Sequence, residues 1–230
     1  MPQNKVGRRE AILMFGAAGA ALTLGCGGES PTSPTTTSGG STTGGTTNAA
    51  CAVTPSETAG PFPSLTDLIR SDIREGKSGT TLSLTITVVS SANNCSPVEN
   101  VNVEIWQCDA TGNYSQYGSQ TAQSYLRGIQ TTNSNGEVTF TTIYPGWYQG
   151  RATHIHAEVT RSGAVVKTTQ MAFPESTNAT VYRTGVYASK GTNPTSNTRD
   201  GIFADSIDSE LAAVSGDPAS GYTATFRIAV

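Results

Sequence analysis

The stretch "TLSLTITVVS", residues 81–90, alternates apolar side chains with the hydroxyl side chains of Ser and Thr. Every second residue from Leu82 to Val88 is apolar, and the residues between them are polar. Neighbouring residues of a β-strand point to opposite faces, so this alternation predicts a strand with one buried face. The other face is expected to meet solvent.

Similar runs along the chain predict five further strands, at residues 101–107, 137–143, 154–160, 164–173 and 222–230. Residues 161–163 (Arg-Ser-Gly) join two of these strands as a hairpin turn. The clearest helical signal is short, around residues 207–214. Short strands at regular spacing with little helix are typical of all-β proteins. We therefore expect an antiparallel β-sandwich over residues 51–230.

Residues 1–26 have the pattern of an export signal. A basic beginning with Arg8-Arg9 precedes an apolar stretch from Ala11 to Leu24, which is shorter than a membrane span of about 20 residues. The arginine pair resembles a bacterial twin-arginine signal, with an ordinary basic n-region as the alternative. Residues 23–26 (Thr-Leu-Gly-Cys) resemble a lipobox, although Thr stands where Leu is usual. We expect a bacterial protein exported to the cell envelope or beyond it, anchored to the membrane by a lipid on Cys26.

Residues 27–50 consist almost entirely of Gly, Ser, Thr and Pro. Such a composition buries too little apolar surface to fold, so it predicts a flexible linker ahead of one domain at residues 51–230. The whole chain has a net charge of −3, and only 13% of its residues are charged. Because it lacks a cluster of basic residues, nucleic acid is not an expected partner.

Three cysteines follow Cys26, and some of them are expected to form a disulfide in an exported protein. Cys95 and Cys108 flank the predicted strand at residues 101–107, which would hold them roughly 20 Å apart. A disulfide requires Cα atoms within about 7 Å, so these two are not expected to pair. A bond from Cys51 to one of them is expected, and the sequence leaves open which one.

The histidines of the chain are His154 and His156, two residues apart on a predicted strand. Residues i and i+2 of a strand share a face, so the pair would form a two-ligand element for a metal. Two polar residues on a solvent-facing strand are the alternative. Without a third histidine, a three-histidine zinc site and a cupin-type cluster are excluded. A ferrous site with a distant carboxylate remains open.

Tyrosines lie close to this pair in the sequence. Tyr144 and Tyr148 precede the histidine strand, and Tyr114 and Tyr117 lie in the loop after residues 101–107. Phenolate is a hard, anionic ligand that suits Fe³⁺, whose charge can hold tyrosine deprotonated far below its ordinary pKa of about 10. Two phenolates and two neutral imidazoles would leave the ion with one net positive charge, which leaves room for a chelating dianion.

The domain resembles the intradiol ring-cleavage dioxygenases, non-haem ferric enzymes that include catechol, hydroxyquinol and protocatechuate dioxygenases. It is most similar to their smaller, exported members. Four segments carry the resemblance in the family's order: "TPSETAGPFP" (54–63), "VEIWQCDATGNYS" (103–115), "YLRGIQTTNSNGEVTFTTIYPGWY" (125–148) and "GRATHIH" (150–156). Residues 174–230 are less distinctive.

Matched by motif, the resemblance implies that Fe³⁺ is held by Tyr114, Tyr148, His154 and His156. Tyr114 would also act in catalysis, since the family's catechol displaces this tyrosinate, which can then take a substrate proton. Arg151 matches the arginine that stabilises charge developing on the substrate ring, with a surface salt bridge as the alternative. The neighbouring tyrosines, Tyr117 and Tyr144, are expected to be packing or surface residues.

Three further residues match positions that border the substrate in the family: Gly60, Pro61 and Gln170. A structural turn is an equal interpretation of the first two. Ala172 stands where an aromatic residue is commoner, which leaves the shape of the pocket open.

The implied reaction is cleavage of a catechol by O₂ between its two hydroxyls, giving a cis,cis-muconate type of product without an organic cofactor. A small aromatic diol and O₂ are therefore the expected partners, and family members often form homo-oligomers. Two other functions remain open on the sequence alone: a non-catalytic β-sandwich binding module at the cell surface, and a ferrous oxygenase with a carboxylate ligand.

Overall fold

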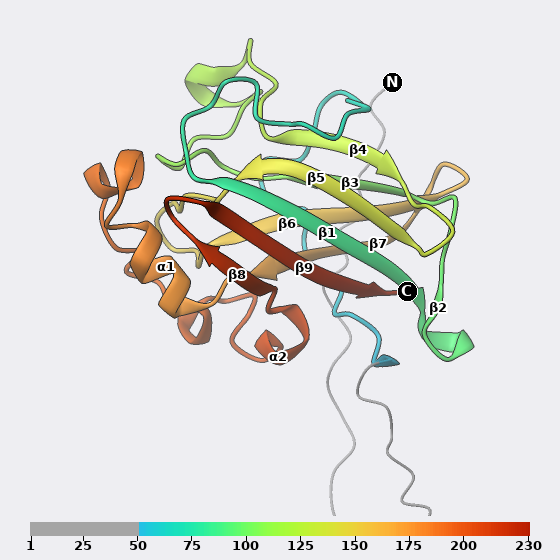
Figure 1. Cartoon of the computed structure of the whole chain (residues 1–230). Coiled ribbons are helices and arrows are strands. Elements are labelled where there is room, and N and C mark those ends of the chain that lie inside the picture. The colour runs from blue at the N-terminus through green and yellow to red at the C-terminus, as the bar shows by residue number, and fades with distance from the viewer. Residues whose placement is uncertain (1–50) are drawn as a thin grey trace, which may run out of the picture. The chain divides into compact units, whose positions relative to one another are not determined.

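The computed structural model describes residues 51–230, which form a β-sandwich (Figure 1). The export signal expected at residues 1–26, its Cys26 and the linker expected at residues 27–50 lie outside the described residues. Within the described part, no helix is long and apolar enough to cross a membrane.

Strands of the described domain form two sheets, which lie one behind the other in Figure 1. The first sheet has the order β2 (Ser96–Pro97), β1 (Thr81–Ser90), β9 (Gly221–Ala229) and β8 (Ala213–Asp217), and β5 (Glu137–Ile143) also pairs with β1. The second sheet has the order β4 (Arg127–Thr131), β3 (Asn102–Trp106), β6 (His154–Arg161) and β7 (Ala164–Ala172).

Helical structure is confined to short segments of the described domain. The α-helices are α1 (Glu175–Val181) and α2 (Ile207–Glu210). Single 3₁₀ turns occupy Ser91–Asn93, Gly118–Gln120, Gly185–Ser189 and Asn197–Arg199. The connections between β7 and β8 therefore carry most of the helix.

The all-β sandwich with little helix is confirmed, and each predicted strand is present with ends that differ by at most one residue. One pairing differs from the antiparallel expectation. β1 and β9 run parallel, with Leu82 opposite Tyr222, so the first sheet is mixed. β9 forms a hairpin with β8, and the final strand thereby enters the sheet between β8 and β1.

The helix expected at residues 207–214 is wrong in its second half. α2 ends at Glu210, and Ala213 and Val214 begin β8, where hydrogen bonds to β9 replace those of a helix. The elements α1, β2, β4 and β8 have no counterpart among the sequence expectations. β4 shows why: Arg127 and Gly128 are both buried, so the strand lacks an alternating pattern.

The core lies between the two sheets. Leu82, Leu84 and Ile86 of β1 are fully buried in one apolar cluster with Ile155 and Ala157 of β6. Successive residues of a strand point to opposite faces. The residues of β6 between these positions therefore project from the outer face of the second sheet, and they include both histidines.

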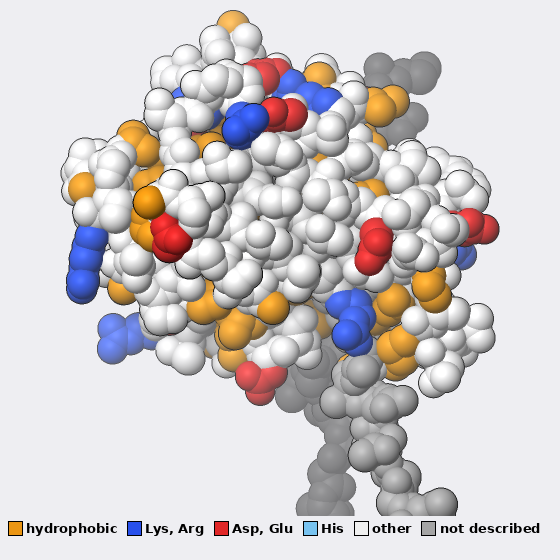
Figure 2. Space-filling view, in the orientation of Figure 1, with side chains coloured by type: hydrophobic (Ala, Val, Ile, Leu, Met, Phe, Trp, Pro, Cys, Tyr) orange, Lys and Arg blue, Asp and Glu red, His pale blue; other side chains and the backbone are white. Residues whose placement is uncertain are grey.

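The outer face of the first sheet is covered with hydroxyl side chains. Figure 2 shows it largely without charged or apolar colour over the centre of the domain. Thr85 and Thr139 are neighbours across β1 and β5, and their hydroxyls lie 3.1 Å apart. The tyrosine and histidine chemistry expected from the sequence belongs to the other sheet.

The disulfide left open by the sequence joins Cys51 to Cys95, with a Cα–Cα distance of 5.3 Å. It ties the start of the domain to the turn between β1 and β2. Cys108 is a free cysteine, buried just beyond β3. Ser162 and Gly163 form the turn between β6 and β7, both at positive φ, as the tightest β-hairpins require.

Candidate metal centre

His154 and His156 lie side by side on β6, and their Nε2 atoms are 3.2 Å apart. Both are buried even though they project from the outer face of the sheet. His154 Nδ1 lies 2.6 Å from the carbonyl oxygen of Ala152, so it carries the proton and leaves the lone pair on Nε2. The ring of His156 stacks on Trp106 of β3 at 4.9 Å, almost parallel to it.

Burial controls the charge of both imidazoles. It lowers the pKa of His154 to about 3, helped by the positive charge of Arg151. The pKa of His156 is also held well below its ordinary value, by burial first and then by His154. Both rings are therefore neutral at pH 7, which is the state that coordinates metals.

Tyr148 and Tyr114 lie beside the histidines. Tyr148 Oη is 3.4 Å from His154 Nε2, and its ring lies 5.7 Å from that of Tyr114. Tyr114 is 6.3 Å from His156 between ring centroids. The Tyr114 hydroxyl is buried and has no hydrogen-bond partner. Burial raises the pKa of both phenols, so neither would ionise at pH 7 without a nearby cation.

Hydrogen bonds among these four side chains leave polar atoms unsatisfied, which coordination of a metal ion would relieve. A buried hydroxyl without a partner is costly, and the Nδ1 of His156 also has none. The two Nε2 atoms can share a hydrogen bond only if His156 carries its proton on Nε2, and Nδ1 of His156 is unpartnered in either tautomer. Within the described residues, no group of three or more His, Cys, Asp or Glu side chains could hold a metal. A metal here would therefore draw on the tyrosines, and a highly charged ion is needed to ionise them.

The hydroxyls of the two neighbouring tyrosines bond elsewhere, although the ring of Tyr117 packs in the same apolar cluster as Tyr114 and Tyr148. Tyr117 Oη donates a hydrogen bond of 2.7 Å to the carbonyl of Pro63. Tyr144 Oη donates one of 2.7 Å to the Asn178 side chain, inside the main core. Each hydroxyl is therefore already hydrogen-bonded outside the histidine pair.

Arg151 and Gln170 lie next to the cluster. Arg151 Nη2 donates to Gln170 Oε1 at 2.6 Å, and Arg151 Nη1 lies 3.5 Å from Tyr148 Oη. Gln170 lies directly opposite His156 in the pairing of β7 with β6, and its Nε2 donates to the carbonyl of Thr58 at 2.8 Å. The guanidinium thus faces the atoms that would surround a metal-bound substrate.

Gly60 and Pro61 differ in their relation to the cluster. Gly60 has a φ of +69°, and a Cβ built on it would lie 3.0 Å from His156 Cε1. The backbone therefore passes directly over the imidazole, which a larger residue would obstruct. Pro61 is exposed.

Phe62 and Phe203 complete the surroundings, and sequence reasoning missed both. Phe62 stacks on Tyr114 at 4.6 Å and meets the edge of Tyr148 at 6.0 Å. Phe203 packs against Ala172. It thereby supplies an aromatic ring beside the small side chain of Ala172, and this ring lies 6.3 Å from that of His154. Phe62 could have been found from the sequence, because it lies in the same motif as Gly60. Phe203 could not, because it lies in the less distinctive residues 174–230.

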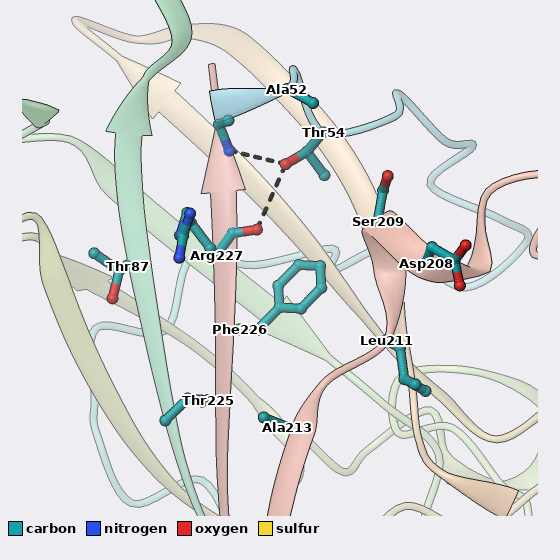
Figure 3. A pocket seen from close by; sticks show the side chains of 11 residues that line it. Ala52, Thr54, Thr87, Asp208, Ser209, Leu211, Ala213, Thr225, Phe226 and Arg227 are labelled. Carbon is teal, nitrogen blue, oxygen red and sulfur yellow. Dashed lines mark hydrogen bonds between the residues drawn. The ribbon is translucent and has the colours of Figure 1, made fainter. Parts of the chain in front are cut away.

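A hollow of about 170 Å³ opens beside Tyr114. Its walls include Phe62 and Tyr117, so it has aromatic sides next to the candidate ligand. A larger hollow of about 360 Å³ lies elsewhere, between β9, α2 and the first residues of the domain (Figure 3). There Thr54 is hydrogen-bonded to the backbone of β9. This larger hollow contains none of the residues expected at the metal site.

Residues 59–204 match the family described as Dioxygenase. The structure is similar to the intradiol ring-cleavage dioxygenase from Tetranychus urticae, with 30% sequence identity and a TM-score of 0.72, over 78% of this chain and 94% of that one. The chain belongs to the intradiol ring-cleavage dioxygenase family. The resemblance inferred from the four sequence segments is thereby confirmed.

Two other structures place this family member among its relatives. The dioxygenase domain of a carbohydrate-binding fusion protein from Streptomyces sp. SirexAA-E is 29% identical, with a TM-score of 0.59, over 78% of this chain and 98% of that one. Catechol 1,2-dioxygenase from Pseudomonas arvilla C-1 is 18% identical, with a TM-score of 0.55, over 76% and 61%. At that identity the likeness shows the fold alone. No curated protein matches the sequence.

Proposed function

We propose that this family member is a non-haem Fe³⁺ enzyme that cleaves a catechol-type ring between its hydroxyls with O₂, giving a cis,cis-muconate type of product. The observation that carries this proposal is the buried meeting of two neutral imidazoles with two phenols, one of which has no partner for its hydroxyl. Tyr114, Tyr148, His154 and His156 would hold the ion. Bound Fe³⁺ would supply Lewis-acid activation of the aromatic diol.

The chain's own residues have distinct tasks in this scheme. Tyr114 Oη would accept a proton from a catechol hydroxyl. Arg151 would stabilise negative charge on the ring, because Nη1 and Nη2 both point toward the cluster. Gln170 would keep that guanidinium in place from the substrate side. Phe62, which stacks on Tyr114, would keep water from the reacting atoms.

The location of the protein is proposed separately. Arg8-Arg9 and Cys26 support an exported, lipid-anchored protein of a bacterial envelope that meets small aromatic diols outside the cytoplasm. Replacing both arginines by lysine keeps the basic charge but removes the twin-arginine pattern. We expect that change to block export of folded, iron-loaded protein, measured by fractionation. Unchanged export would favour an ordinary signal.

Oxygen uptake tests the activity. Purified protein loaded with Fe³⁺ is offered catechol, hydroxyquinol and protocatechuate, and the products are identified. We expect a red-brown colour from charge transfer between phenolate and iron, and uptake of one O₂ per ring cleaved. Protein that stays colourless with added iron and consumes no oxygen would contradict the proposal and favour a non-catalytic binding module.

A further inference from the structure

Asp200 lies behind the candidate site, in the connection between α1 and α2, far from it in sequence. Its side chain is fully buried, whereas that of Arg151 is 16% exposed. A buried carboxylate needs partners that compensate for the loss of water. Asp200 Oδ1 accepts hydrogen bonds from the backbone N–H groups of Ile202, at 2.8 Å, and Phe203, at 3.4 Å.

The other oxygen of the same carboxylate bonds two residues next to the candidate ligand His154. Asp200 Oδ2 accepts from Arg151 Nε at 2.9 Å and from the backbone N–H of Ala152 at 2.6 Å. With Nε held from behind, Nη1 and Nη2 of Arg151 are the atoms that face Tyr148 and Gln170. Two contacts, from Nε to Asp200 and from Nη2 to Gln170, fix the plane of the guanidinium, which a single contact would not ensure.

Ala152 extends this connection to a candidate ligand. Its N–H is held by Asp200, and its carbonyl oxygen lies 2.6 Å from Nδ1 of His154. That contact fixes the tautomer of the imidazole and directs Nε2 toward the cluster. One buried carboxylate is therefore hydrogen-bonded to the candidate catalytic arginine and, through one residue, to a candidate metal ligand.

We infer, on the basis of the function proposed above, that Asp200 is a positioning residue that sets the orientation of Arg151 and of His154 together. Removing its charge leaves the arginine free to turn and weakens the support of the histidine. Losses of 10- to 100-fold in activity or metal affinity are typical when such supporting groups are removed. We expect a loss of about this size in kcat/KM for Asp200→Asn, mostly in kcat.

A double-mutant cycle tests the link to Arg151. Asp200→Asn, Arg151→Gln and the double variant are compared in kcat/KM, with the exposed Asp208→Asn as the matched control. If Asp200 acts through Arg151, the double variant loses much less than the product of the two single losses. Multiplicative losses would overturn this link. Should Asp200→Asn fail to fold, Asp200→Ser keeps an oxygen acceptor and takes its place in the cycle.

Iron affinity tests the link to His154 without using turnover. Fe³⁺ is withdrawn by a competing chelator while the phenolate-to-iron colour is followed. We expect Asp200→Asn to release iron at least several-fold more readily than Asp208→Asn. Equal release from the two variants would overturn the link. Wild-type protein that binds iron but cleaves no catechol would count against the proposed function, whereas an active wild type with a multiplicative cycle would count only against Asp200.

Discussion

At the scale of single residues, the hydroxyl of Tyr148 decides whether the site is a ferric tyrosinate centre. Tyr148→Phe removes one candidate phenolate and leaves the ring in place. We expect the visible band of the iron-loaded protein to disappear or shift strongly, and ring cleavage to fall at least 100-fold. Tyr117→Phe is the matched control, because its hydroxyl bonds the carbonyl of Pro63. Equal spectra for both variants would remove Tyr148 from the ligand set.

Gly60 offers a second test at this scale, because it combines positive φ with close contact to His156. Gly60→Ala should cost about 1–2 kcal/mol in backbone strain. The new methyl group should also displace the imidazole of His156 and weaken iron binding. Gly163→Ala shares the positive φ, with open space around the new Cβ. We expect both variants to melt at lower temperature and only Gly60→Ala to bind iron more weakly, measured by calorimetry and chelator competition. Equal iron binding by the two variants would contradict a close contact between residue 60 and His156.

Residue-level prediction from the sequence succeeded where the information is local. The spacing of His154 and His156 on an alternating strand was sufficient to place both rings on one face. Asp200 carries no such signal, because its partners beside the candidate site, Ala152 and Arg151, lie 48 and 49 residues away in the chain. Its role depends on how the connection after α1 folds back over β6 and β7. No local pattern encodes that arrangement.

At the scale of elements, α2 is held against β7 by a buried carboxyl. Glu210 contacts Ser206 of its own segment and accepts from Thr169 Oγ1 of β7 at 3.5 Å. Burial raises the pKa of Glu210 to about 7 from an ordinary value of 4.5. The folded state therefore binds a proton more tightly than the unfolded state. Stability from this group is present below the ordinary pKa and is lost as the pH rises toward about 7.

Substitution of Glu210 should remove that pH dependence. Glu210→Gln keeps the size and hydrogen bonds but cannot ionise. We expect its melting temperature to exceed that of the wild type at pH 8 and to match it near pH 4, measured by thermal unfolding across this range. Asp208→Asn, an exposed change in the same helix, should leave the wild-type profile intact. If Glu210→Gln changed the melting temperature by the same amount at every pH, ionisation of Glu210 would not be the cause of the pH dependence.

The same elements show where sequence patterns end. β1 alternates cleanly because one face meets the core and the other meets solvent. α1, with sequence "ESTNATV", is poor in strong helix formers. It persists because its buried Asn178 accepts from Tyr144 and donates to the carbonyl of Phe173. Tertiary contacts of this kind override local propensity, so the helix was not predictable from its own residues.

At the scale of the whole molecule, the domain closes on itself through its two ends and one disulfide. Thr54 bonds the backbone of β9, the last strand, and Cys51 bonds Cys95 beyond β1. The first residues of the domain are thus fixed beside the final strand. Gln170, opposite His156, bonds the carbonyl of Thr58. Order at the candidate site therefore depends in part on how the start of the domain is held.

The disulfide spans a sequence separation of 44 residues, so it restricts the unfolded chain considerably. By the loop-entropy relation, a bridge of this size contributes about 4 kcal/mol to the free energy of unfolding. We expect the double variant Cys51→Ser, Cys95→Ser to lose about 3–4 kcal/mol in denaturant titrations. Wild-type protein under reducing conditions should match it, because Cys108 is buried and already free. A loss below about 1 kcal/mol would contradict the view that the bridge stabilises the domain by restricting the unfolded chain.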